Sequence, residues 1–306
     1  MPRPCRVCVV GSANVDLTFR ISRLPQPGET LAGHALHTGL GGKGANQAVA
    51  AARLGAEVAF VACVGDDAFG AEAIDRYQAE GIDTTFVRRV AKQPTGAAAI
   101  LVDDAAENCI IVVAGANAEL SAADVRRAAS VIEQADIVLC QLETPLEGTL
   151  EAFCLARAAG KRTVLTPAPA APLSDELLGL CDLCVPNRTE AEVLAGRPIY
   201  GIEDARRTAE ALRARGVGSA VVTMGDSGAV LVDDAGSWHV PAIQVEAVDA
   251  TGAGDAFTAA LAVSLAEGLN LEEAGRRASV AAAISVMRIG AQSSFPDRRE
   301  LSERTP

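Results

Sequence analysis

The sequence predicts a three-layer α/β/α fold with a central, mostly parallel sheet and a small β lid, and three observations lead to this prediction. First, short β-branched runs alternate along the 306 residues with alanine-rich stretches of helical periodicity, as in βαβ units. Second, 49% of the residues are hydrophobic but only 3% are aromatic, which is typical of a buried parallel sheet covered by small-residue helices. Third, residues of about 12–40 and 95–114 alternate in polarity without a helical period.

The strands are predicted from short β-branched runs, and the helices from apolar residues that recur with the helical period. Apolar residues in Lys43–Leu54 recur at i, i+3, i+4 and i+7, and Gly55 supplies a stop. Ser121 and Asn270 are predicted N-caps. The predicted strands are Arg6–Val10, Val58–Val64, Ile137–Gln141, Thr163–Thr166, Leu183–Val185 and Ala220–Thr223. The predicted helices are Lys43–Leu54, Gly70–Ala79, Ala122–Gln134, Leu146–Ala159, Glu203–Arg215, Ala253–Glu267 and Leu271–Met287.

The two regions without helices are predicted to form the lid. Thr95–Val102 and Asn108–Val113 are typical of a hairpin around residues 103–107. A small β layer at one edge of an α/β body is suited to close over a ligand. No linker or repeat divides the sequence, so residues 1–306 are expected to form a single domain with a discontinuous lid.

Charge and hydropathy exclude several classes of partner. The net charge of −12 repels phosphate backbones and anionic membranes, so nucleic acid and membrane binding are not expected. No uninterrupted apolar stretch reaches the roughly 18 residues of a membrane span. The first residues lead into a strand without the apolar core of a signal peptide, so a cytoplasmic protein is expected.

Two cysteine pairs, Cys5/Cys8 and Cys181/Cys184, have the C-x-x-C spacing of zinc ligands. Each pair lies in or beside an extended apolar run, where residues i and i+3 point to opposite faces of a strand. We therefore predict buried, reduced thiols rather than a zinc site.

The segment Val248–Phe257 carries the clearest chemistry. Gly252 and Gly254 permit close approach of the backbone to a ligand, and the free N–H groups of the following helix point at it. Such donors suit the negative charge that develops on a phosphoryl group in transfer, and Asp255 is placed to accept a proton from an attacking hydroxyl. The alternative is an ordinary helix N-terminus in which Asp255 complements the helix dipole.

A second glycine-led helix begins in Gly39–Ala48. It is not a Walker A loop, because glycine follows Lys43 where that motif has Ser or Thr. Gly42, Lys43 and Asn46 combine close backbone approach, a cation and an amide, which suits a ligand with several hydroxyl groups. A helix N-terminus with a solvated lysine is the alternative.

Polar side chains also follow three predicted strands. Asn14 and Asp16 come after the first strand, and Glu143 comes after Ile137–Gln141, at the strand ends where open α/β sheets bind ligands. Their carboxylate and amide groups can bind hydroxyls, although an Asx turn at Asn14 is the alternative. After a further strand, Asn187 and Glu190 have a spacing that suits hydrated Mg²⁺ or a helix cap.

A glycine turn follows the strand that ends at Thr223. It suits a nucleotide phosphate or ribose, but also any tight β connection. The turn residues are Gly225, Asp226, Ser227 and Gly228.

The order and spacing of these segments resemble the ribokinase family of the phosphofructokinase-B sugar-kinase superfamily, from about Val7 to Pro296. Gly41–Ala48 is similar to the first signature of the family, and Gly252–Asp255 is similar to the second. Ala114–Asn117 and Gln141–Glu143 are also ribokinase-like.

The resemblance implies roles for individual residues. Asp255 would be the base, and the backbone of Gly252, Ala253 and Gly254 would form an anion hole. The sugar would contact Asn14, Asp16, Gly42, Lys43, Asn46 and Glu143. Asn187 and Glu190 would serve the Mg²⁺–phosphate region, and the nucleotide would lie near Asn187, Gly254, Ser279 and residues 223–228. A monovalent cation would lie at Asp249, Thr251, Ser285, Arg288, Gly290 and Ser294.

The implied reaction is ATP-dependent phosphorylation of D-ribose at O5, with Mg²⁺ and K⁺, by a homodimer joined through the lid. The sequence departs from the family pattern at Ala250, where a small β-former such as Thr is usual, and at Ser279, where a larger polar residue is common. Neither change removes a group that the reaction requires.

Two other functions remain open at this point. One is a kinase for 2-deoxyribose, a ketohexose or a nucleoside, although the lid has few aromatic residues to stack a nucleobase. The other is a non-catalytic sugar sensor, against which the presence of Asp255, Asn187 and Glu190 argues.

Overall fold

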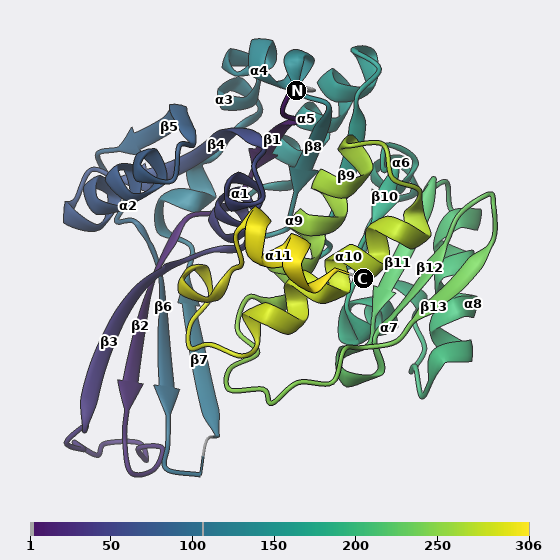
Figure 1. Cartoon of the computed structure of the whole chain (residues 1–306). Helices are drawn as coiled ribbons and strands as arrows, with labels where there is room; N and C mark the ends of the chain where they lie inside the picture. The colour runs from purple at the N-terminus through teal and green to yellow at the C-terminus, as the bar shows by residue number, and fades with distance from the viewer. Residues whose placement is uncertain (1–2, 106, 306) are drawn as a thin grey trace.

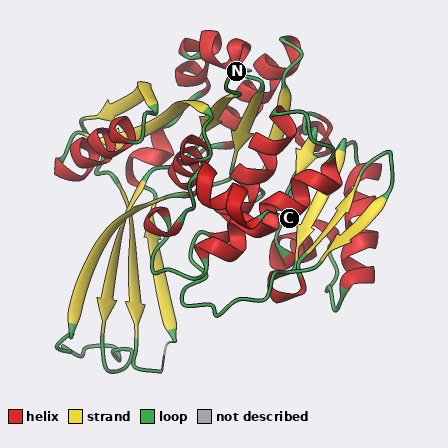
Figure 2. Ribbon diagram, viewed as in Figure 1, coloured by secondary structure: helices red, strands yellow, loops and turns green. Residues whose placement is uncertain are grey.

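The computed structural model describes residues 3–105 and 107–305 and confirms the predicted three-layer α/β fold (Figures 1 and 2). Its larger sheet has the order β13-β12-β11-β10-β9-β8-β1-β4-β5 and is parallel except for β12, which pairs antiparallel with both β11 and β13. These strands are β1 Arg6–Val10, β4 Glu57–Gly65, β5 Asp83–Val90, β8 Ile137–Cys140, β9 Arg162–Leu165, β10 Leu183–Cys184, β11 Ser219–Thr223, β12 Ala229–Val232 and β13 Ser237–Val240.

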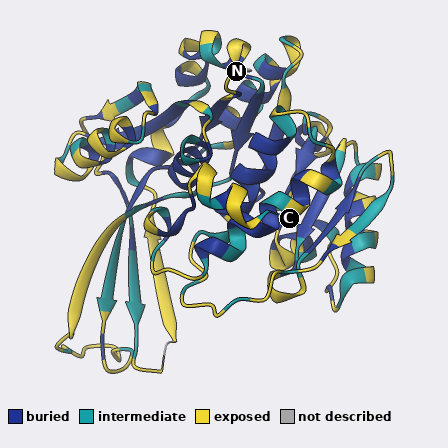
Figure 3. Cartoon of the chain, viewed as in Figure 1, coloured by how far each residue is buried: buried dark blue, intermediate teal, exposed yellow. Residues whose placement is uncertain are grey.

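Helices cover both faces of this sheet, and each face has its own hydrophobic cluster (Figure 3). The helices α1, α2, α9, α10 and α11 cover one face, and α3 to α8 cover the other. The helices are α1 Lys43–Arg53, α2 Ala68–Ala79, α3 Ala122–Arg127, α4 Ala129–Gln134, α5 Leu146–Ala158, α6 Asp175–Gly179, α7 Arg188–Ala195, α8 Ile202–Ala214, α9 Ala253–Ala266, α10 Leu271–Ser285 and α11 Arg298–Arg304. Short 3₁₀ turns lie at η1 Gly115–Glu119, η2 Gly225–Ser227 and η3 Gln292–Ser294.

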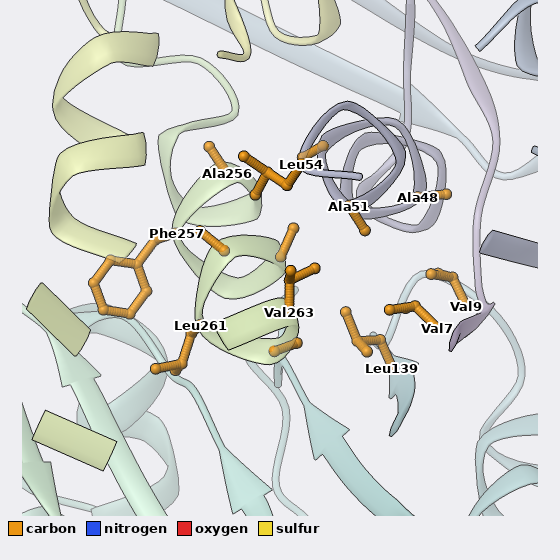
Figure 4. Packing of buried hydrophobic residues seen from close by; sticks show 14 of the residues in the cluster. Val7, Val9, Ala48, Ala51, Leu54, Leu139, Ala256, Phe257, Leu261 and Val263 are labelled. Atoms are coloured by element: carbon orange, nitrogen blue, oxygen red, sulfur yellow. The ribbon is translucent and has the colours of Figure 1, made fainter. Parts of the chain in front are cut away.

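Small side chains let α1 and α9 pack closely on each other and on the sheet (Figure 4). Ala48 and Ala51 of α1 are fully buried beside Ala256 and its neighbours on α9, with Val7 and Val9 of the sheet beneath them. Short side chains allow two helices and a sheet to approach with native packing density, so this part of the core needs few aromatic residues. The two glycine-led helices of the sequence are therefore neighbours.

The prediction that the paired cysteines are buried thiols is confirmed. Cys5, Cys8, Cys181 and Cys184 are free, buried thiols. Cys5 belongs to one hydrophobic cluster and Cys8 to the other, so the two side chains point to opposite faces of the sheet, as the spacing on a strand requires.

The element boundaries differ from the prediction in a few places. The helix expected over Ala122–Gln134 is broken at Ala128, which ends α3 and precedes α4. Alanine is a strong helix former, so the residue pattern carries no signal for this break. The strands β5, β12 and β13 and the short helices α6 and α11 were not predicted. Both predicted N-caps, Ser121 and Asn270, form capping boxes.

A second, four-stranded sheet projects from one edge of the body (Figure 1). Its order is β3-β2-β6-β7, with β6 and β7 paired as the predicted hairpin. Figure 3 shows that its outer strands are exposed. Among the described residues, no helix combines the length and apolarity needed to cross a membrane. The strands of this sheet are β2 Asn14–Arg20, β3 Ala35–Gly41, β6 Gly96–Val102 and β7 Asn108–Val113.

Candidate active site

The candidate site lies at the carboxyl ends of β1 and β8, where the strand order of the sheet reverses. Ser12, after β1, donates its hydroxyl to the Glu143 carboxylate after β8 (2.5 Å). The backbone N–H of Lys43 donates to the same oxygen of Glu143 (2.8 Å). These contacts tie both strand ends to the start of α1.

Glycines allow the chain before α1 to lie against β2. Gly42 has a φ of 86°, and a side chain there would contact the backbone N of Asn14 at 2.9 Å. A side chain at Gly41 would overlap the Asp16 carboxylate, and one at Gly44 would contact the backbone N of Ser12 at 2.5 Å. The glycine segment therefore brings the predicted hydroxyl-binding residues together.

Asn14 is held in place by Asn117, which follows the hairpin of the small sheet. Asn117 Nδ2 donates to Asn14 Oδ1 (2.7 Å), and its Oδ1 accepts from the N–H of Ala13 (2.9 Å). Gly96 packs against both amides, because a Cβ at this position would overlap Asn117 Nδ2 and Asn14 Oδ1. The Asn14 side chain is thus buried and oriented without a ligand.

Asp16 lies among other carboxylates. Burial, together with the charges of Glu143 and Asp255, raises the pKa of Asp16 to about 6. Lys43 provides the balancing cation: burial disfavours its charged form, but Asp255, Glu143 and Glu190 raise its pKa above the ordinary value. A ligand rich in hydroxyl groups would find both acceptors and a cation here.

The second glycine turn begins α9. Gly252 has a φ of 79° and packs so closely on the segment before α11 that a Cβ would lie 3.0 Å from Ala291 and Phe295. The N–H of Ala253 donates to Ala250 O (3.2 Å) and completes the turn. No hydrogen bond joins the N–H of Gly252 or Gly254 to another residue in the described part of the chain. These two groups are donors that an anion can use.

Asp255 is buried in the first turn of α9. Its Oδ2 accepts from Asn46 Nδ2 (2.9 Å), and its Oδ1 accepts from Gln47 Nε2 (3.1 Å). Burial raises the pKa of Asp255 above its ordinary value, because the Lys43 ammonium and the Asn46 and Gln47 amides, which lower this pKa, offset the effect of burial only in part. The geometry thus places a carboxylate directly beside free helix N–H groups.

Asn187 and Glu190 form a capping box at the start of α7. Asn187 donates through its N–H and its Nδ2 to the Glu190 carboxylate (both 2.8 Å), and Glu190 N–H donates to Asn187 Oδ1 (2.9 Å). Of the two interpretations of this spacing, the structure realises the helix cap; nothing in that geometry places a metal. Asn187 also pairs with Thr223 through a β-bridge, so both lie at neighbouring strand ends.

The turn after β11 is open to solvent. Gly225, Asp226 and Ser227 form η2 and are exposed, and Met224 N–H donates to Gly228 O (2.7 Å) to close the turn. Ser279 lies on the buried face of α10. A nucleotide bound over this turn would therefore contact mainly exposed residues.

The residues predicted to hold a monovalent cation lie on two segments that Asp249 joins. Its carboxylate accepts from Thr251 N–H (2.9 Å), Thr251 Oγ1 (2.6 Å) and Gly290 N–H (2.8 Å). Burial opposes ionisation of Asp249, but these donors hold its pKa below the ordinary value. The Arg288 guanidinium pairs with Glu300, and among the described residues no backbone N–H donates to the Arg288 carbonyl. Ser285 and Ser294 donate to Ala282 O and Ala291 O (both 2.8 Å).

Several residues in contact with the site were not assigned from the sequence. Ser12 and Asn117 hold Glu143 and Asn14, and Gln292 Nε2 donates to Asn46 Oδ1 (3.2 Å). Gln47 contacts Asp255 directly, and it is adjacent to Asn46 in a motif that the sequence had already indicated. Gln141, which donates to Gln47 (2.7 Å), lies in a run quoted only for resemblance.

A buried carboxylate between hydroxyl-binding groups and free helix N–H donors, at the switch point of an α/β sheet, defines a small-molecule kinase of the α/β class. The sequence matches the pfkB family carbohydrate kinase over residues 5–298. The chain belongs to this family and is a carbohydrate kinase.

Individual relatives match over nearly the whole length. The chain is 43% identical to the ribokinase of Haemophilus influenzae over 295 residues, covering 96% of each chain. It is 39% identical to a deoxyribokinase of Salmonella typhimurium over 298 residues, covering 97% of each. A solved structure of Arabidopsis thaliana ribokinase complexed with ribose and ATP matches with a TM-score of 0.91 and 34% identity, over 98% of each chain.

Proposed function

We propose that this protein transfers the γ-phosphoryl group of ATP to the O5 hydroxyl of D-ribose, giving D-ribose 5-phosphate and ADP. The observation that carries the proposal is the position of Asp255. Its carboxylate accepts a hydrogen bond from Asn46 of the proposed sugar-binding helix and lies in the same helical turn as the free N–H groups of Gly252 and Gly254. Relatives named ribokinase, one of them solved with ribose and ATP, support the choice of substrates.

In the proposed reaction, Asp255 accepts the proton of the O5 hydroxyl while that oxygen attacks the γ-phosphorus in line. The bond from the γ-phosphorus to the bridging oxygen breaks, and ADP leaves. The N–H groups of Gly252 and Gly254 hold the negative charge that develops on the phosphoryl oxygens. The N–H of Ala253 donates to Ala250 O within the turn, so Ala253 supports the anion hole by fixing the backbone conformation between the two glycines.

The sugar is proposed to bind on the β2 side of the Gly252 turn. Asn14, Asp16 and Glu143 accept from its hydroxyls, and Lys43 and Asn46 donate to its oxygens, with Gly42 permitting close approach. We also propose that the sheet of β2, β3, β6 and β7 acts as the lid of a single kinase domain. Its closure would exclude water and limit the hydrolysis of ATP.

The nucleotide is proposed to lie over Thr223 and residues 225–228, with Ser279 near the adenine and Asn187 near the phosphates. Glu190, whose two oxygens accept from Asn187, would serve the Mg²⁺ region only through the water molecules of a hydrated ion, whose charge offsets that of the phosphates. The ionised carboxylate of Asp249, with the backbone carbonyls of Thr251, Ser285, Arg288, Gly290 and Ser294, offers the oxygen ligands that suit K⁺. These hard oxygen donors fit both ions.

We further propose a cytoplasmic homodimer joined through the lid. Strand β7 supports the dimer, because Ile110, Ile111, Val112 and Val113 are each more than half exposed on the edge of the small sheet. A contiguous apolar edge strand of this kind is normally covered. Light scattering of Ile111→Asp against the unaltered protein tests the assembly, with a shift from dimer to monomer expected.

The experiment that tests the function is ADP release with Mg²⁺-ATP and saturating K⁺ across ribose, 2-deoxyribose, fructose and adenosine. Turnover with ribose, lost when a large inert cation replaces K⁺, is the expected result. Preference for 2-deoxyribose is the second candidate, since relatives at 39% identity are named deoxyribokinase. Absence of turnover on every acceptor by folded protein would refute the proposed function.

A further inference from the structure

Behind Asp255 lies a chain of buried amides that the proposed reaction has not used. Gln47 of α1 has no exposed surface, and its Nε2 donates to Asp255 Oδ1 and to Thr166 Oγ1 (both 3.1 Å). Its Oε1 accepts from Nε2 of Gln141 (2.7 Å), a buried residue that directly follows β8. Because Asn46 binds the other oxygen of Asp255, adjacent residues of one helix hold both carboxylate oxygens.

The direction of this chain of hydrogen bonds follows from the charge of Asp255. An ionised carboxylate only accepts, so Gln47 has to turn its NH₂ group towards Asp255 and its carbonyl towards Gln141. Gln141 must then present its own NH₂ group to Gln47. As a result, Gln141 Oε1 is turned towards Gly11, where it is buried and has no partner among the described residues.

An unpartnered buried oxygen costs stability, so this arrangement is unfavourable at the Gln141 end. This loss of stability at Gln141 is offset at Asp255, where the buried carboxylate accepts hydrogen bonds from both Asn46 and Gln47. Gly11 makes room for it, since a Cβ there would overlap Gln141 Oε1. The network therefore supplies donors to an ionised Asp255, although this leaves one of its own acceptors, Gln141 Oε1, without a hydrogen bond among the described residues.

We propose that Gln47 is a positioning residue that holds the carboxylate of Asp255 in one orientation and in its ionised form, and that Gln141 and Thr166 hold Gln47. The inference rests on the proposed function, in which Asp255 is the base. Since no surface of Gln47 is exposed, it acts through Asp255 and touches neither the sugar nor the nucleotide.

The charges around Asp255 determine what the loss of Gln47 does. Lys43 on α1 faces it as a cation, and Glu143 after β8, Asp16 on β2 and Glu190 on α7 face it as carboxylates. Burial and the neighbouring carboxylates raise the pKa of Asp255. Without the Gln47 amide, only Lys43 and Asn46 remain to lower this pKa. The base then takes up a proton at a higher pH.

The test is the pH dependence of kcat and KM for the nearly isosteric variant Gln47→Met. We expect kcat to fall by about tenfold to a hundredfold, because a misplaced base loses its alignment. The acid limb of the kcat profile should move to higher pH, while KM for sugar and ATP changes little. Gln141→Met should shift both readouts in the same direction by less. The control is Gln78→Met, at an exposed position on α2.

Gln47→Glu tests the direction of the hydrogen bonds. It keeps the size of the side chain but places an acceptor where Asp255 needs a donor, so the acid limb should move further than in Gln47→Met. An unchanged kcat and acid limb in Gln47→Met would overturn the proposal, as would a loss confined to thermal stability and KM. If Gln47→Met does not fold, Gln141→Met decides by the same criteria.

The outcomes separate this inference from the function on which it rests. Unaltered protein that releases no ADP with any acceptor refutes the proposed function. Active protein in which Asp255→Asn is inactive, but Gln47→Met behaves like the unaltered protein, refutes only the positioning role.

Discussion

The two sides of the Gly252 turn are built differently. On the acceptor side, Asn14, Asn46 and Asp255 are buried and already joined to protein partners. On the side proposed to bind the nucleotide, residues 241–252 form an irregular segment, most of it exposed, and Asp226 and Ser227 are exposed in η2. We infer that the acceptor side is ordered by folding itself, and we expect a bound nucleotide to order the exposed groups on the other side.

The difference has a chemical reason. The base and the hydroxyl that it deprotonates must meet within hydrogen-bond distance, so the acceptor side gains most from a fixed geometry. The nucleotide needs only to be held with its γ-phosphate at the turn, so the residues that bind the rest of the nucleotide can be positioned less precisely. Substitutions on the acceptor side should therefore change kcat or the KM for sugar strongly, and those on the nucleotide side should change the KM for ATP weakly.

The largest expected effect is that of Asp255→Asn. The amide keeps the size of the side chain but cannot take the proton, so kcat should fall by about 10²–10⁴. Binding of sugar, measured by calorimetry, should persist. Asp226→Asn, the same change in the exposed turn, serves as the control. Turnover of Asp255→Asn close to that of the unaltered protein would show that another group is the base.

Next in size is Gly96→Ala, which disturbs the orientation of Asn14. The added Cβ would overlap Asn14 Oδ1 and Asn117 Nδ2. Overpacking of this kind costs about 1–3 kcal/mol, so the KM for sugar should rise by about tenfold or more while that for ATP stays the same. Gly39→Ala is the matched control, because nothing lies within 4 Å of its Cβ position. Equal effects of the two variants would contradict the role of the Asn14–Asn117 pair.

The segments on the acceptor side were also those for which the sequence indicated local structure most directly. Gly252–Asp255 and Gly42–Asn46 are short segments that lead into helices, so local sequence determines both their conformation and their chemistry. Their contact was not predicted: the hydrogen bond from Asn46 to Asp255 forms because α1 and α9 pack against each other. The fold class could be predicted for a similar reason, since the alternation of strands and helices is a local property of the chain.

Contacts between distant parts of the chain escaped prediction. Gln141 reaches Gln47, 94 positions away, and Gln292 reaches Asn46, 246 positions away, and each pair meets only because separate elements pack together. For Asn187 and Glu190, one spacing serves both a helix cap and a metal site, so the sequence could not choose. Local patterns indicate which groups are present, but tertiary packing decides which of them touch.

A third, smaller effect should appear in the pH dependence of sugar binding. The pKa of Asp16 is raised to about 6 by burial and by Glu143 and Asp255. As the pH falls through this value, Asp16 takes up a proton and ceases to be an ionised acceptor. The KM for sugar should therefore rise by up to about tenfold per pH unit below about 6, while that for ATP changes less. In Asp16→Asn this rise should disappear; a persistent rise would assign the titration to another group.

The smallest effect is expected on the nucleotide side, for Ser279→Ala. Ser279 lies on α10 and is proposed to face the adenine, where its hydroxyl can make one neutral hydrogen bond. Such a bond contributes about 0.5–1.5 kcal/mol, so the KM for ATP should rise by about twofold to tenfold. The KM for sugar should not change, because the acceptor side is fixed by its own hydrogen bonds. The control is Ser264→Ala on α9, which removes a buried hydroxyl that has no partner in the described part of the chain. A change in the KM for sugar as large as that for ATP would show that the two sides are coupled, and that the acceptor side is not independently ordered.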